Sequence, residues 1–260
     1  MIAGSTGLFL LAASCSALGG LLGMASGIFI VPALTLLCQL DVRSAIGAGL
    51  VSVVACSCAS AGPLLRAGLA DLRLALLLET ATTGGALGGL LLFGRIPQRV
   101  LLVLFAAVLL VSAWQMARPR LGAAVEAASP SRRRLSFGMV LMFAAGLLSS
   151  LLGVGSGVLK IPAMDAALRL PIRISSATSN VMIGVTASAG AASALLAGRV
   201  GPALAGPVVL GSIAGALLGA RLLLLLDTRR LRAGFVLVLL LLAVRMGWAA
   251  WHGTPGAAGG

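Results

Sequence analysis

The chain has 260 residues, of which 60% are apolar and only 10% are charged, and its formal net charge at pH 7 is +13. Because a soluble domain carries about 25% charged residues, this composition excludes a water-soluble globular protein. The apolar residues form long blocks without polar alternation, which also excludes a transmembrane β-barrel. The composition therefore predicts an all-α polytopic membrane protein.

The first half of the chain contains five apolar segments. The stretch from Met1 to Asp41 has no Lys or Arg, whereas a secretory signal peptide begins with a basic region, so we expect a membrane segment at the N-terminus. About 20 apolar residues span the roughly 30 Å hydrocarbon layer as a helix. The predicted segments cover residues 5–23, 27–39, 44–65, 72–93 and 98–117, within a first transmembrane repeat of residues 1–117.

A polar linker is predicted at residues 118–135, between the two halves. It contains prolines, serines and five arginines, three of them in the run 132–134. Loops rich in Lys and Arg stay in the cytoplasm, so we expect the linker there. The positive net charge is interpreted as this topology signal. The partner expected for it is anionic membrane lipid, and nucleic acid is not an expected partner.

The second half matches the first at a fixed offset of 130 positions, the difference between Pro162 and Pro32. Matches of Gly, Pro and Arg at one offset are hard to obtain by chance in a chain rich in Leu and Ala, so an internal duplication is predicted. The second repeat covers residues 136–250, with segments at 136–153, 157–169, 174–197, 202–226 and 230–250, and a short tail follows at 251–260. The matched pairs include Gly27 with Gly157, Arg43 with Arg173, Gly85 with Gly215, Gly89 with Gly219 and Arg99 with Arg229.

The two short segments, 27–39 and 157–169, decide the predicted topology. If they do not cross the membrane, each half has four spans and the copies are parallel; if they cross, each half has five and the second copy is inverted. With five, most arginines lie on the cytoplasmic side, whereas with four this asymmetry disappears. We therefore predict 8–10 membrane segments in an inverted repeat. The arginines left on the extracytoplasmic side are Arg43, Arg95, Arg99 and Arg199.

Two glycine-rich stretches that end in proline interrupt the apolar segments at equivalent positions. Glycine tolerates a positive φ, so a helix can break there, and a half-helix that begins after the break presents free N–H groups to an anion. Paired interruptions of this kind indicate a transporter site. The alternative is that such glycines only let helices pack closely, as we expect for Gly211, Gly215 and Gly219. The candidate substrate-binding residues are Gly23, Ser26, Gly27 and Pro32 in the first stretch and Gly153, Gly155, Ser156, Gly157, Lys160 and Pro162 in the second.

Two charged residues lie within apolar segments. Lys160 is the only lysine of the chain, and a charge at the bilayer centre costs at least about 2.5–3.5 kcal/mol. We expect it to face a cavity or to pair with an acid, for which Asp165 is one candidate; it either binds an anion directly or snorkels to the membrane surface. Glu79 is a candidate for proton coupling or helix gating, with a bond to a neighbouring helix as the alternative.

Three motifs of the chain recur together in a known family. They are the two glycine-rich stretches that end in Pro-Ala, the run from Ala177 to Thr186, and the segment from Gly68 to Arg73. In these motifs the chain resembles the TauE/SafE family of membrane anion transporters. The resemblance covers almost the whole chain. It implies a multi-pass protein of a bacterial-type cell membrane that transports small anionic substrates such as sulfite or organosulfonates.

The resemblance also implies a role for three polar residues in the second half. Thr178, Ser179 and Asn180 are expected to supply hydroxyl and amide donors to the anion, close to the second glycine-rich stretch. The alternative for these side chains is packing between helices, with hydroxyl bonds to carbonyl groups of their own helix.

An enzyme is not expected from this sequence. The single histidine, His252, lies in the tail, and the chain has only six acidic residues, so a general acid–base pair within the membrane is difficult to assemble. Cys15, Cys38, Cys56 and Cys58 have no second metal-binding group nearby, so no metal or other cofactor is expected. An anion channel or a structural membrane subunit with the same fold stays an alternative to the transporter. The sequence leaves both a monomer and a homo-oligomer open.

Overall fold

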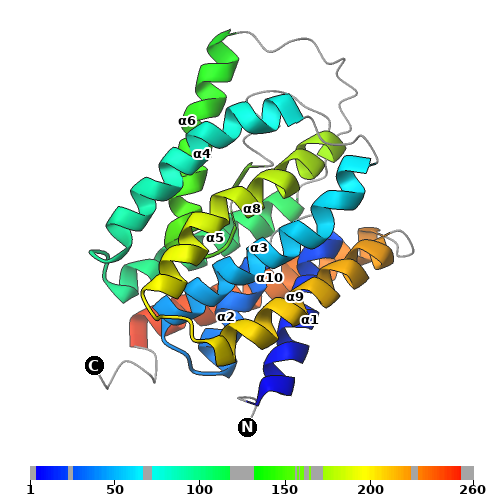
Figure 1. Cartoon of the computed structure of the whole chain (residues 1–260). Coiled ribbons are helices and arrows are strands. Elements are labelled where there is room, and N and C mark those ends of the chain that lie inside the picture. Colours follow the sequence, from blue (N-terminus) through cyan, green and yellow to red (C-terminus); the bar gives the residue numbers. More distant parts are fainter. Residues whose placement is uncertain are drawn as a thin grey trace.

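The computed structural model describes residues 4–22, 26–66, 72–117, 132–155, 157, 159–160, 164, 172–223 and 228–252. These residues are helical apart from short connections, and they include no β-strand. In chain order the helices are α1 (Ser5–Leu22), α2 (Gly27–Leu37), α3 (Val42–Arg66), α4 (Leu72–Phe93), α5 (Gln98–Ala117), α6 (Arg132–Leu152), α8 (Ile172–Leu196), α9 (Pro202–Leu223) and α10 (Thr228–His252). The predicted all-α fold is confirmed (Figure 1).

Several of these helices are long and apolar enough to cross a membrane, judged by length and composition. Within the described residues five stretches meet this criterion: Val42–Gly62, Leu72–Phe93, Leu135–Leu152, Thr178–Leu196 and Pro202–Gly219. Shorter apolar helical stretches lie at Ser5–Gly19, Gly27–Leu37, Gln98–Trp114 and Val236–Trp251. Most of the predicted linker, residues 118–131, lies outside the described part of the chain, and α6 begins at Arg132.

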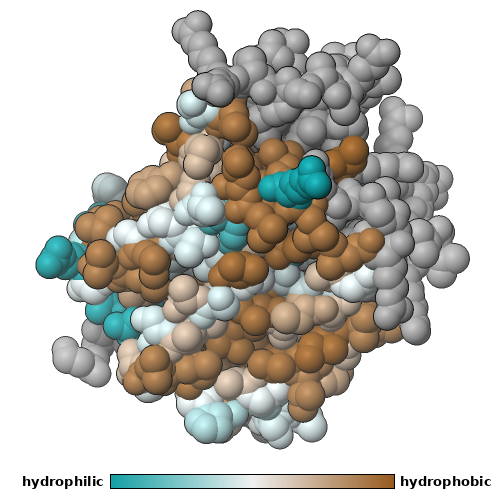
Figure 2. All heavy atoms as spheres, turned by 45° about the horizontal axis from the view of Figure 1, so that its top comes forward, coloured by the Kyte–Doolittle hydropathy of each residue, from teal (hydrophilic) through white to brown (hydrophobic). Residues whose placement is uncertain are grey.

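The outward-facing side chains of the helices are largely apolar. Leu91 is 78% exposed, Leu76 is 70% exposed and Val244 is 68% exposed. Figure 2 shows apolar side chains spread over much of the described surface in this view. An apolar surface of this extent is unfavourable in water, whereas hydrocarbon chains of lipid solvate it well.

Helices α1 and α9 pack through a row of glycines. A Cβ atom added at Gly215 would collide with the carbonyl oxygen of Ala13, and Gly211 and Gly219 meet the carbonyl oxygens of Phe9 and Ala17 in the same way. Small residues at such spacing let two helix backbones touch. The predicted packing role of these three glycines is confirmed.

Helices α4 and α6 pack in the same manner, at positions shifted by 130 residues. Gly85 and Gly89 of α4 lie against the carbonyl oxygens of Phe143 and Leu147 of α6. Figure 1 shows α4 and α6 side by side. At the offset of 130 residues, α1 corresponds to α6, α3 to α8 and α4 to α9. The contact between α1 and α9 therefore corresponds to the contact between α6 and α4, and the contact between α3 and α9 corresponds to that between α8 and α4. This correspondence is what the predicted duplication would produce.

Helices α3 and α8, which occupy equivalent positions in the two halves, run antiparallel. Gly47 near the start of α3 packs against Ala194 near the end of α8, and Leu50 packs against Gly190. In a duplication with parallel copies, equivalent helices would cross the membrane in the same direction. An antiparallel pair is the arrangement that an inverted repeat requires, and the inverted repeat itself stays a prediction.

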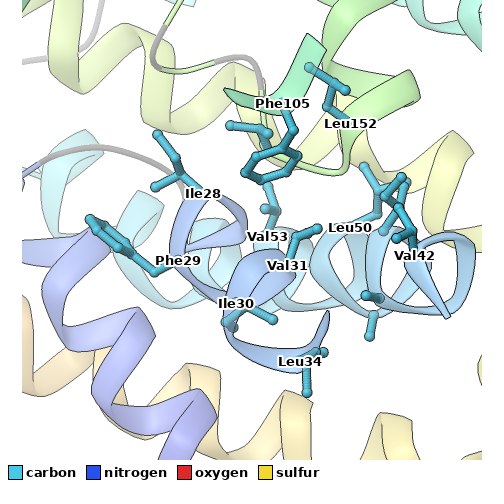
Figure 3. Close-up of a cluster of buried hydrophobic side chains, with 14 of the residues drawn as sticks. Ile28, Phe29, Ile30, Val31, Leu34, Val42, Leu50, Val53, Phe105 and Leu152 are labelled. Carbon is cyan, nitrogen blue, oxygen red and sulfur yellow. The ribbon is translucent and has the colours of Figure 1, made fainter. Parts of the chain in front are cut away.

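Helix α2 lies inside the largest apolar cluster. Eight of its 11 residues are buried. Figure 3 shows Ile28 and Val31 of α2 in one cluster with Phe105 of α5 and Leu152 of α6. A helix that is apolar and buried on all sides lies within a protein rather than at its surface. The described part of the first glycine-rich stretch, residues 26–32, is thereby placed in the interior.

We predict that Gly215→Ala and Gly85→Ala each destabilise the protein by about 1–3 kcal/mol, because the new Cβ meets a backbone carbonyl that cannot rotate away. The thermal midpoint of the purified protein in detergent measures this loss. Gly206→Ala is the matched control, since Gly206 lies in α9 with open space at its Cβ position. It should leave the midpoint unchanged or slightly higher. Equal midpoints for the three variants would contradict backbone contact between these helices.

Candidate functional site

The glycine-rich stretch of the second half interrupts a helix, as predicted. Helix α6 ends at Leu152. Gly153 and Gly155 then adopt φ angles of +66° and +70°, a region that residues other than glycine rarely adopt. The Gly153 N–H donates to the carbonyl oxygen of Ser149 at 2.9 Å. In the first half, α1 ends at Leu22 and α2 begins at Gly27. The predicted site residue Gly23 lies between them, outside the described residues.

The two glycine-rich stretches meet inside the protein. A Cβ atom at Gly27 would collide with the carbonyl oxygen of Gly153 and with Val154. Gly49 of α3 approaches the same carbonyl oxygen, which would lie 2.9 Å from a Cβ at that position. The break in the second half is therefore held by backbone contacts that only glycine permits. Pro32 lies inside α2 and is buried.

A row of three buried serines connects the first stretch to α3 and α9. Ser26 precedes α2, and its Oγ lies 2.7 Å from the Oγ of Ser52 in α3. The Ser52 Oγ lies 2.7 Å from the Oγ of Ser212 in α9. None of the three residues is exposed. The serine row thus places three hydroxyl groups, bonded to one another, next to the contact between the two stretches.

The second stretch leads to a buried ion pair between Lys160 and Glu79 of α4. The Lys160 Nζ lies 3.1 Å from the Glu79 Oε2 and donates to the Thr186 Oγ1 of α8 at 2.6 Å. The Thr186 hydroxyl in turn donates to the Glu79 Oε1 at 2.5 Å. Lys160 is fully buried and Glu79 is 8% exposed. The ammonium, the carboxylate and the hydroxyl therefore form a closed triangle of charge-assisted bonds.

Two further threonines complete the surroundings of Glu79. The hydroxyl of Thr82 donates to the Oε2 of Glu79 at 2.9 Å, and that of Thr83 lies 3.4 Å from the Oε1. Both belong to α4, within one turn of Glu79. A buried carboxylate is costly unless its lone pairs are bonded, and here ammonium and hydroxyl groups supply those bonds. Both candidate charges of the sequence thus belong to one cluster.

Sequence reasoning singled out Lys160 and Glu79 separately and did not pair them. The acid considered as the partner of Lys160, Asp165, lies outside the described residues, as do the site candidates Ser156 and Pro162. The roles of Thr82, Thr186, Ser52 and Ser212 were missed. One signal was present: Thr82 and Ser212 stand 130 positions apart, so both halves carry a hydroxyl at this place in the repeat.

The predicted donors in α8 have different environments. Thr178 and Ser179 are fully buried, and the Ser179 Oγ has no hydrogen-bond partner among the described residues. Asn180 is partly exposed, and its carbonyl oxygen accepts a bond from the Ser57 Oγ of α3 at 2.6 Å. The Gly184 N–H donates to the same Ser57 Oγ at 3.1 Å. The Ser57 hydroxyl therefore inserts between two backbone groups that would pair within a regular helix.

The remaining predicted residues, Gly155 and Gly157, are both buried, and they precede Lys160 in the chain by five and three positions. Within the described residues no group of three or more His, Cys, Asp or Glu side chains could hold a metal ion, and the four cysteines are free thiols. Among the described residues, the site therefore has hydroxyl groups, backbone amides, one ammonium and one carboxylate. Such groups suit the binding of a small anion and the transfer of a proton.

The sequence was compared with known families and proteins. The model of the family described as "Sulfite exporter TauE/SafE" matches residues 8–246. The chain is 29% identical over 205 residues to "Probable membrane transporter protein YdhB" of Bacillus subtilis (strain 168), covering 78% of this chain and 83% of the relative. It is 30% identical over 111 residues to "Probable membrane transporter protein YunE" of the same organism, covering 43% of this chain and 41% of that relative. No solved structure matches.

The family model covers nearly the whole chain, so the resemblance seen in the sequence motifs is confirmed. The five membrane-length helices agree with it. The chain belongs to the TauE/SafE sulfite exporter family, and it is a multi-pass membrane protein of a transporter family.

Proposed function

We propose that this protein is a secondary transporter that moves small sulfur-containing anions, such as sulfite or organosulfonates, across the cytoplasmic membrane. The observation that carries the proposal is the buried pair of Lys160 and Glu79, at the junction of α4, α8 and the segment after the helix break. The family description makes sulfite the first substrate to test.

Lys160 supplies the positive charge that an anion requires inside a membrane. The Thr186 hydroxyl already bonds this ammonium, and Ser179 stands seven positions earlier in α8, on the same face of the helix. The buried Ser179 hydroxyl has no bond partner among the described residues. An oxyanion accepts hydrogen bonds from ammonium and hydroxyl groups alike. Lys160 and Thr186 would replace water at one point of the anion's path, and Ser179, two helical turns away, would do so at another.

Glu79 competes with the substrate for Lys160. When the carboxylate is ionised, it neutralises the ammonium, and an added anion would meet a site without net charge. When Glu79 takes up a proton, the ammonium is free to balance the anion. The described groups that face this carboxylate are Lys160, Thr186, Thr82 and Thr83. One proton would therefore travel with one anion, in the same direction.

The closed ion pair favours a carrier over a channel. An anion can reach Lys160 only if the triangle of Lys160, Glu79 and Thr186 opens, and these residues belong to three separate segments. Binding thus requires the segments to move relative to one another, which is the step that alternating access exploits. Counterflow of labelled against unlabelled sulfite would show a carrier, whereas a channel would give conductance without counterflow.

We predict that Lys160→Met abolishes saturable sulfite uptake into proteoliposomes. It should also destabilise the protein by about 3–5 kcal/mol, because Glu79 then stays buried without a counter-charge. The double variant Lys160→Met with Glu79→Gln removes both charges, so its thermal midpoint should recover while uptake stays absent. Ser188→Ala is the control, since this exposed hydroxyl of α8 donates to the Val185 carbonyl oxygen of its own helix. Wild-type uptake by a stably folded double variant would contradict the role of Lys160.

We predict that Glu79→Gln removes the dependence of transport on a proton gradient. In the wild type, an inward proton gradient should increase uptake of the anion, because the proton that travels with the anion neutralises Glu79 and releases Lys160. Glutamine takes up no proton, so its uptake should be equal with and without an inward proton gradient. Methanesulfonate is the suitable probe, because its own charge does not change between mildly acidic and mildly alkaline buffer. Retention of the wild-type gradient dependence by the variant would exclude Glu79 as the coupling group.

A further inference from the structure

A small, partly open cavity between α3, α4, α6 and α8 has two guanidinium groups in its wall. Its volume is about 10 Å³, and its lining includes Arg43, Arg199, Phe93, Ser150 and Ser193. A space of this size holds about one water molecule. Both arginines are half-buried, so water hydrates their charges only in part.

The lining of the cavity carries positive charge without negative charge. It includes no acidic side chain, and neither arginine forms an ion pair with a carboxylate of the described residues. The Arg43 Nη2 donates to the carbonyl oxygen of Ile96 at 3.3 Å, and the guanidinium of Arg199 lies 5.1 Å from the centroid of the Phe93 ring. Each group therefore has a neutral neighbour and retains donors for an anion.

The nearest acid in the chain is occupied elsewhere. Asp41 precedes α3, and its Oδ2 accepts bonds from the N–H groups of Arg43 at 3.0 Å and Ser44 at 3.4 Å. These bonds satisfy the first amides of α3, which is the usual role of an aspartate at a helix N-terminus. The carboxylate thus stabilises the start of the helix and leaves the guanidinium of Arg43 available.

The cavity lies next to the contact between the two glycine-rich stretches. Ile46 belongs to its wall, and the carbonyl oxygen of Ile46 lies against Gly153, which in turn meets Gly27. The cavity is formed by the start of α3 and the ends of α4 and α8. In the predicted inverted topology this end of the helices is extracytoplasmic, because the arginine-rich linker follows the opposite end of α5.

We propose that Arg43 and Arg199 form a second anion site, at the extracytoplasmic entrance to the Lys160 site. Its ligand is a small sulfur oxyanion or the sulfonate group of a larger molecule, and this inference rests on the proposed anion transport. A planar guanidinium binds two oxygens of an oxyanion at once. Because the cavity is smaller than such an anion, Arg43 exchanges the Ile96 carbonyl for the anion when the site fills.

The test compares the kinetics of Arg43→Gln and Arg199→Gln with the wild type in right-side-out and inside-out vesicles. Each change should raise the KM for sulfite added from the extracytoplasmic side about tenfold, the factor expected for one lost charge-assisted hydrogen bond. The kcat should stay within about twofold. Arg95→Gln is the matched control, because Arg95 is exposed, lies at the same end and is absent from the cavity wall. Arg43→Lys should recover part of the affinity.

A binding measurement separates the failure of this inference from the failure of the transport proposal. It is the shift of the thermal midpoint in detergent on addition of sulfite or methanesulfonate. If the wild type transports sulfite while both glutamine variants match Arg95→Gln in KM and in thermal shift, the arginine site is overturned alone. If sulfite shifts the thermal midpoint of the wild type but not that of the glutamine variants, and neither the wild type nor the variants give flux, the arginine site is supported and the transport proposal is overturned. Absence of both shift and flux in the wild type overturns both.

Discussion

The ion pair between Lys160 and Glu79 is the interaction on which the arrangement of the second half depends. Both residues are buried, and a buried charge without a partner is costly in an apolar interior. The pair brings α4 of the first half against α8 and the broken segment of the second. The two halves are thereby joined at one polar point within an otherwise apolar interior. A motion that separated the charges would leave each of them without its counter-charge, which is costly in an apolar interior.

Close backbone packing makes this arrangement possible. Water is absent from the hydrocarbon layer, so apolar contact with another helix offers little advantage over contact with lipid, and dispersion between closely fitting surfaces matters more. The glycines of α4 and α9 let α6 and α1 approach until carbonyl groups fill the place of a side chain. The same geometry recurs where Gly27 meets Gly153. Closely packed helix pairs then surround the break at Gly153 and Gly155, where the backbone departs from a regular helix.

The two halves share a framework but differ in charge. In the second half the site holds Lys160, whereas the matching position in the first half is Ile30, and the counterpart of Glu79 is Val209. Ile30 is buried in the apolar cluster and Val209 packs against it. At the first stretch the serine row, formed by Ser26 and Ser52 of the first half and Ser212 of the second, stands in place of an ion pair. A site of low symmetry results, with neutral donors on one side and a charged pair on the other.

The sequence by itself determined the membrane class, the approximate helices, the family resemblance and the helix break at Gly153 and Gly155, because each of these depends on local composition or on residues close together in the chain. It also identified Lys160 and Glu79 as exceptional, since a charge in an apolar block is visible without a structure. Only the tertiary structure decided that they are partners, because their contact joins positions 81 residues apart. The same holds for the serine row, in which Ser52 and Ser212 are separated by 160 positions. A hydroxyl within an apolar helix has the same appearance in a sequence whether it bonds its own helix or a distant one, and only the packing of the helices selects between the two.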